Sequence, residues 1–314
     1  MKRNTKLLQR TRIAVAVALT VSLAGCGGGG DGGTEQPTNL VTVSTANQDT
    51  VAHAGAAALG LIGVTNVMPL GATASMSHAL AASGTKRPLT VYPPEVQPCM
   101  VSGSMSLTWD DRNGSVMMDV GDVIAIDFNA CANDASGTAD GHAVATITAA
   151  GDTTMSLRMV MTGLSTTSVS HTLTVGGALT VDVTADADGN TVAMQMVADG
   201  PLTVAAQTHG FDDTVTLQSG FAQNATFDAN GTSHVTAAGR IESTAMGGAV
   251  DVSTLAELVN TTTDANPSAG TILLTGKAGK LTVTAAGASV RLDLDDDDDG
   301  ETEATKTQPW DWLL

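Results

Sequence analysis

The sequence predicts a mainly β fold: an antiparallel meander of roughly 12–16 strands forming a curved half-barrel or barrel-like sheet, with a short N-terminal helical segment. From Met100 onward, Thr, Val, Ala, Leu and Met alternate in short stretches. Turn-forming residues separate these stretches, as in Asp110–Gly114, Asp186–Asn190 and Asp228–Gly231. The spacers are too short for parallel crossovers, and a sheet this long must curl, close or split into two layers.

The individual strands follow from the alternation and from the turns between them. Examples of the expected strands, in chain order, are residues 101–109, 123–129, 142–149, 172–175, 178–185, 192–197, 202–207, 214–218, 222–227, 234–241, 271–275, 280–285 and 289–294. Two later segments are expected to differ, with a helical turn over Val250–Leu258 and a surface loop over Asn260–Pro267.

The segment before the sheet has a different pattern of apolar residues. Apolar and small residues recur at helical spacing over Asn47–Val64, which predicts one short helix, and a second is expected over Ala72–Ala82. The small residues would let the first helix lie close against a sheet. Four prolines in Pro88–Pro98 predict an extended connection to the first cysteine of the β region.

The first 25 residues are typical of an export signal. Five basic residues precede an apolar run from Ile13 to Leu23, and no acidic residue occurs before Asp31. A run of about eleven residues is too short for a permanent transmembrane helix, but it suits the apolar part of a secretory signal peptide.

The signal ends in Leu-Ala-Gly-Cys26, which resembles the bacterial lipobox. That resemblance implies acyl chains on Cys26, passage through the lipoprotein export and sorting machinery, and anchoring in a membrane. Gly27 follows the cysteine where an inner-membrane retention signal would place Asp, so the outer membrane of the cell envelope is the expected location. The alternative is an ordinary signal peptide with a chance cysteine.

Four segments follow from these patterns. They are a lipoprotein signal peptide (residues 1–25), a lipidated cysteine with a glycine-rich tether (26–46), a helical and extended N-terminal segment (47–98) and an antiparallel β domain (99–314).

Composition narrows the classes of partner and the nature of the core. The formal net charge is −18, so nucleic acid would be repelled and no nucleic-acid partner is expected. Aromatic residues make up only 3% of the chain, so smaller aliphatic side chains must supply the core. Such a core gains from covalent links.

Two cysteines remain once Cys26 is lipidated. Cys99 and Cys131 are expected to form a disulfide, because exported chains fold in an oxidising compartment. A reactive or metal-binding pair is the alternative. The closed loop would stabilise the fold by roughly 3–4 kcal/mol in the chain-entropy model.

The β region resembles a group of uncharacterised proteobacterial lipoproteins over roughly residues 95–314. The matching motifs are Cys99-x-x-Ser-Gly-Ser, Asp110-Asp-Arg-Asn-Gly, Gly121-Asp122, Phe128-Asn-Ala-Cys131, Gly270–Gly276, Val290–Asp295 and Trp310-x-Trp312-Leu313. The resemblance implies β hairpins between paired cysteines. It implies no activity.

One acidic run resembles the start of a calcium-binding loop. Asp295, Asp297 and Asp299 precede Gly300 in the pattern D-x-D-x-D-G, whose alternate carboxylates can converge on a hard cation. Glu301 could offer its carbonyl and Glu303 a carboxylate, which makes a tentative calcium site. Lys306 occupies the position where an EF-hand needs a bidentate glutamate, so a β-hairpin site is expected instead. The alternative is a solvated acidic turn with no bound ion.

Two functions of different class remain open. The first is a non-catalytic structural or surface domain, held by its lipid anchor and clipped by calcium at its C-terminal hairpin. The second is a carrier or receptor for an apolar, lipid-like ligand in the concave face of a half-barrel, a hypothesis that rests on fold analogy. No enzyme is expected, because there is no Gly-x-Ser-x-Gly motif and no histidine has zinc-site spacing.

Overall fold

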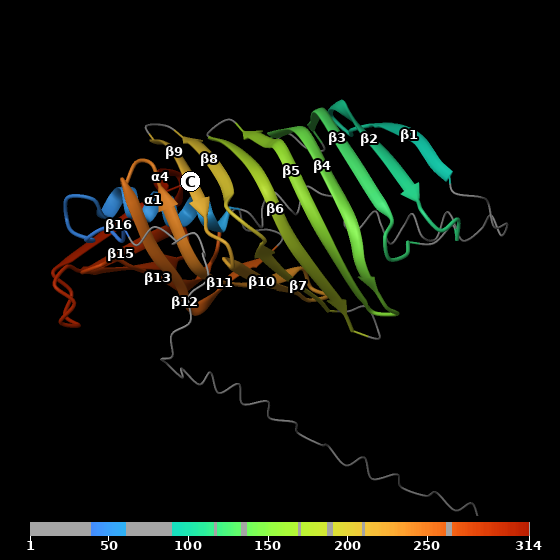
Figure 1. Cartoon of the computed structure of the whole chain (residues 1–314). Coiled ribbons are helices and arrows are strands. Elements are labelled where there is room, and N and C mark those ends of the chain that lie inside the picture. Colours follow the sequence, from blue (N-terminus) through green and yellow to red (C-terminus); the bar gives the residue numbers. More distant parts are fainter. Residues whose placement is uncertain are drawn as a thin grey trace, which may run out of the picture. The chain divides into compact units, whose positions relative to one another are not determined.

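Sixteen antiparallel strands form one sheet in the part of the chain that the computed structural model describes (Figure 1). That part comprises residues 39–60, 90–115, 118–132, 137–168, 171–186, 191–208, 211–261 and 266–313. The predicted fold class is confirmed. The signal peptide, Cys26, the expected second helix and most of the Asp186–Asn190 turn lie outside the described residues.

The elements keep the chain order of a meander. They are α1 (Gln48–Leu59), β1 (Thr90–Pro98), β2 (Ser102–Asp111), β3 (Val123–Ala132), β4 (Gly137–Ala150), β5 (Thr154–Ser168), β6 (His171–Ala185), β7 (Val192–Ala198), β8 (Leu202–Thr208), β9 (Phe211–Leu217), β10 (Ala222–Phe227), β11 (Thr232–Ser243), β12 (Gly248–Thr261), β13 (Ala269–Thr275), β14 (Lys280–Ala286), β15 (Ser289–Asp295), β16 (Ala304–Pro309) and α4 (Trp310–Leu313).

The sheet departs from a simple meander in its middle, where six strands close into a ring. The ring runs β6–β7–β10–β11–β9–β8 and returns to β6. It closes because β6 pairs along one of its edges with two strands in succession, and β11 does the same. Along β6, the first half pairs with β8 and the second half with β7, and β11 divides its edge between β10 and β9.

A glycine stands at each of the two branch points. Gly177 in β6 has φ +131° and Gly239 in β11 has φ +136°, conformations that L side chains rarely adopt. The next strand also approaches closely there, because a Cβ on Gly177 would lie 3.0 Å from Cα of Leu202, and one on Gly239 would lie 2.7 Å from Cα of Phe221. The ring therefore depends on two residues without side chains.

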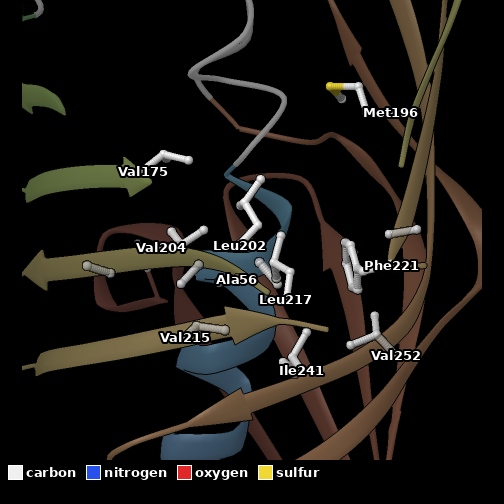
Figure 2. Packing of buried hydrophobic residues seen from close by; sticks show 14 of the residues in the cluster. Ala56, Val175, Met196, Leu202, Val204, Val215, Leu217, Phe221, Ile241 and Val252 are labelled. Carbon is white, nitrogen blue, oxygen red and sulfur yellow. The ribbon is translucent and has the colours of Figure 1, made fainter. Parts of the chain in front are cut away.

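Apolar side chains pack inside the ring (Figure 2). Val175, Val204 and Val215 lie opposite one another across β6, β8 and β9, and Leu217 faces Ile241 where β9 meets β11. Each of the five has 0% of its surface exposed. An eight-stranded barrel is just wide enough to be filled by its own side chains, so a six-stranded ring has less space still.

Helix α1 is buried in the hydrophobic core rather than lying on the surface of the domain. It contacts β8, β9, β11, β13 and β14, and its residues Val51, Ala52 and 54–58 are buried. A helix that is apolar on all sides belongs in a core. Gly55 brings α1 against β13, since a Cβ there would lie 2.9 Å from a methyl carbon of Leu274.

Several sequence predictions are corrected by the structure. The helical turn expected over Val250–Leu258 is wrong, because these residues belong to β12, whose two register shifts against β13 disturb the strand alternation. The strands expected at 172–175 and 178–185 are one strand, β6, which continues through the branch-point glycine. Strands β5 and β16 add to the examples that the alternation suggested.

The expected extended connection at Pro88–Pro98 contains strand β1, whose one partner among the described strands is β2. The backbone N–H of Cys99 points to β2, where it donates to Gly103. The backbone of Pro98 therefore faces outward, and Pro94 lies where the register of β1 against β2 shifts, between Tyr92 and Glu95. Proline has no N–H to offer, so these residues suit an edge strand and discourage further strand pairing.

Replacing Gly239 with alanine is expected to lower the free energy of unfolding by about 2 kcal/mol or more, because the new Cβ would meet the backbone of Phe221, just before β10, in a strained conformation. Urea denaturation measures the change. Gly200→Ala is the matched control, since a Cβ there would meet nothing within 4 Å. Equal stability of the two variants would contradict the branched sheet.

Candidate metal centre

The acidic run forms the connection between β15 and β16. Asp295 is the last residue of β15, opposite Lys280 of β14, and the chain then turns through residues 296–303. The turn needs left-handed backbone at Asp298, with φ 66°, and at Gly300, with φ 91°. The glycine of the D-x-D-x-D-G pattern thus stands where the sharp turn requires it.

Carboxylates within the turn hold its backbone in place. Asp295 accepts hydrogen bonds from the N–H groups of Asp298 (2.6 Å) and Gly300 (3.1 Å). Glu303 reaches back across the hairpin and accepts from Asp296 N–H at 2.7 Å, and Asp299 accepts from Glu301 N–H at 2.8 Å. These bonds fix the directions of several carboxylates before any cation binds.

Four carboxylates converge. Asp295, Asp297, Asp299 and Glu303 each offer one oxygen, and the four oxygens lie within 4.8 Å of one another. Calcium binds oxygen at about 2.3–2.6 Å, so ligand oxygens on opposite sides of the ion are separated by up to roughly 5 Å. The spacing therefore fits one calcium ion. The carboxylate of Glu301, the fifth predicted residue, is not in this set.

Negative charge in the turn exceeds the nearby positive charge. Lys280 forms an ion pair with Asp298, and its pKa is raised, chiefly by this hydrogen bond and also by the charges of Asp298 and Asp295. Asp298 itself lies outside the convergent set. The four convergent carboxylates, with Asp295 partly buried and the other three exposed, repel one another unless a cation joins them.

Lys306 takes no part in the turn, in agreement with the exclusion of an EF-hand. Its Nζ lies 2.6 Å from a carboxylate oxygen of Asp49 in α1. The fourth carboxylate comes from Glu303 instead, three residues earlier. The geometry is that of a β-hairpin site whose remaining ligands would be backbone carbonyls or water.

The predicted disulfide is confirmed. Cys99 follows β1 and Cys131 lies in β3, and they are bonded with a Cα–Cα distance of 5.4 Å. The link crosses β2 and joins strands that are not hydrogen-bonded to each other. It therefore fastens the β1 edge of the sheet to the third strand.

The described histidines are dispersed, and three of them have polar side-chain partners. His142 Nδ1 lies 2.6 Å from Asp127, its cross-strand neighbour in β3. His234 pairs with Glu257 at 3.2 Å, and His171 pairs with Ser168 at 3.0 Å. Sequence spacing did not reveal the pairs of His142 and His234, because their partners lie on neighbouring strands. His78 and His209 lie outside the described residues.

Two buried aspartates were also missed by sequence analysis. Asp122 accepts hydrogen bonds from Trp109 Nε1 and from the N–H groups of Arg112 and Asp119. Asp213 in β9 accepts from Ser243 and Thr244 hydroxyls and from Ala245 N–H. Both carboxylates are saturated by donors that order neighbouring loops, so their arrangement is structural.

Comparisons with known proteins give no relative: no family model, no curated protein and no solved structure matches this chain. In the described part of the chain, neither helix combines the length and the apolar character that crossing a membrane would require.

Calcium is expected to raise the melting temperature of the wild-type protein, and chelator to lower it. The double variant Asp297→Asn plus Asp299→Asn should lose this response, because amides keep the turn's acceptor atoms but remove two ligand charges. A ligand at a hundred times its Kd stabilises by about 2.7 kcal/mol. Differential scanning calorimetry with and without calcium measures the effect.

The matched control is Asp152→Asn plus Asp212→Asn, which removes the same charge at two exposed positions outside the turn. This control should respond to calcium as the wild type does. A calcium response that survives in Asp297→Asn plus Asp299→Asn would remove the site.

Proposed function

We propose that this chain is a lipid-anchored protein of the bacterial cell envelope whose β domain has a non-catalytic, structural or surface role. Its anchor is acylated Cys26, its expected location is the outer membrane, and calcium clips the β15–β16 hairpin. The observation that carries the proposal is the filled ring at the centre of the sheet.

The ring supports a structural role because buried apolar side chains of the described residues fill it. Leu202 and Leu217 face each other across β8 and β9 with no exposed surface, and Phe221 and Met196 belong to the same cluster (Figure 2). Binding proteins need a concave site of several hundred Å³. Closing six strands around packed side chains gives a rigid body instead.

The way the chain joins the sheet supports anchoring from the N-terminal side. Residues 39–43, predicted as the end of the tether, are built into the domain. Val41 donates to Ala249 in β12 at 3.0 Å and accepts from Lys277 N–H at 2.7 Å, and Val43 donates to Ala278 at 2.8 Å. A force applied to the preceding tether would therefore be transmitted to the start of β12 and to the β13–β14 turn.

Glycines make room for this segment. A Cβ on Gly276 would lie 2.3 Å from the carbonyl oxygen of Val41, and one on Gly279 would lie 2.2 Å from that of Val43. Val43 has no exposed surface. The compact unit accordingly begins at Thr38, earlier than the boundary drawn from the sequence.

A second function, a carrier of apolar ligands, is favoured by one observation. Trp109, Ile124, Ala145, Met159 and Leu179 stand opposite one another in turn across β2 to β6. Such a row gives one face of these strands a continuous apolar layer, in which Trp109, Ile124, Met159 and Leu179 are buried, so a carrier would have to open this layer to admit its ligand. An acyl chain would suit that layer chemically.

Mass spectrometry of the full chain, extracted from envelope membranes in mild detergent, tests both proposals. The denatured protein should have the mass of a chain that starts at Cys26 and carries acyl groups. Cys26→Ala should carry none. An intact leader, or Cys26 without acyl groups, would contradict the anchor.

The same preparation under native conditions separates the two functions. A structural domain should show the mass of the acylated polypeptide, with calcium but without a further lipid. A lipid that stays bound, and that is lost when Met159 is replaced with a charged residue, would favour the carrier.

A further inference from the structure

His53 of α1 is enclosed by groups from two other elements. Its ring stacks on Phe211 of β9 with centroids 4.4 Å apart, and lies 4.6 Å from the ring of Trp312 in α4. Its Nδ1 donates a hydrogen bond to the carbonyl oxygen of Leu313 at 3.2 Å. One titratable side chain therefore joins the central helix to the C-terminal end of the described chain.

The C-terminal clasp, defined as residues 304–313 in β16 and α4, is held to the domain at several points. Trp310 Nε1 donates to the carbonyl of Gly287 at 2.9 Å, and Leu313 is buried. Lys306 binds Asp49 at 2.6 Å and lies 4.8 Å from the centroid of the Trp312 ring. Along α1, the clasp thus contacts Asp49 and, one turn later, His53.

The charged groups near His53 belong to α1, β16, β9 and α4. From α1, Asp49 raises the pKa of His53, while Lys306 of β16 lowers it. On β9, Asp212 is exposed, and the buried Asp213 is saturated by Ser243, Thr244 and Ala245. Asp311 of α4 is exposed as well.

Burial is the largest influence on this histidine. Removal of His53 from water outweighs the hydrogen bond to Leu313 and the charge of Asp49, so the pKa of His53 lies below its ordinary value. The closed clasp therefore favours the neutral imidazole. One oxygen of Asp49, Oδ1, is buried without a hydrogen-bond partner, and the charge of this carboxylate favours the protonated imidazole less than burial disfavours it.

We propose that the C-terminal clasp is a proton-sensitive latch on α1, which opens when His53 becomes protonated. With the clasp open, His53 is exposed to water and takes up a proton more readily than in the closed state. Proton binding and opening are therefore linked. The stabilisation that His53 gives the closed clasp is complete above the ordinary histidine pKa. It is lost as pH falls through the lowered pKa of the closed state.

Hydrogen exchange followed by mass spectrometry tests this latch on the full chain. Between about pH 7.5 and pH 5.5, the opening equilibrium of residues 304–313 should rise several-fold after correction for intrinsic exchange rates. His53→Gln keeps a donor for Leu313 without a titrating ring, and His53→Phe keeps the ring stack. In both variants the clasp should open to the same extent at the two pH values.

His142→Gln is the matched control, because that exposed histidine lies on β4, outside the clasp, and should leave the pH response intact. A pH response that persists in His53→Gln, or its absence in the wild type, would overturn the latch. If the His53 variants do not fold, NMR titration of the wild type decides. A His53 pKa at or above the ordinary value would overturn the proposal, and a lowered one, with clasp signals shifting at the same pH, would support it.

Discussion

The rest of the domain depends on how β6 and β11 divide their edges. A strand has two edges, and each of these long strands gives one edge to two successive partners. Such division requires the backbone to bend away from its first partner at one residue, and Gly177 and Gly239 provide these bends. The closed ring that results is the common base from which β1–β5 continue on one side and β12–β16 on the other.

A narrow ring and a helix within the core explain how a chain with few aromatic residues can still bury a core. Aromatic side chains would not fit between β13 and α1, where Gly55 already contacts Leu274. Alanine, valine and leucine bury less area each, but they allow close approach of backbones, and the interior remains densely packed. Residues 304–313 then fasten the β14–β16 edge to α1 and to the β14–β15 turn, as the disulfide fastens the β1–β3 edge.

The sequence predictions that were confirmed rest on local sequence patterns. Strand alternation, turn residues, the paired cysteines and the D-x-D-x-D-G run all depend on near neighbours, so the strands, the disulfide and the convergence of Asp295, Asp297 and Asp299 could be predicted. Ring closure could not, because Gly176-Gly177 looks locally like a break between two strands. Likewise, the bulges of β12 imitate helical spacing, and His53 meets Phe211 and Trp312 only through the tertiary fold.

Amide hydrogen exchange, measured residue by residue under native conditions, tests the closed ring most directly. If β8 and β9 are enclosed between β6 and β11, their amides should exchange only when the whole domain unfolds, while those of β2 and β3 exchange earlier through local opening. Faster exchange in the β8–β9 hairpin than in β2–β3 would mean that the ring is not closed, and would contradict the account.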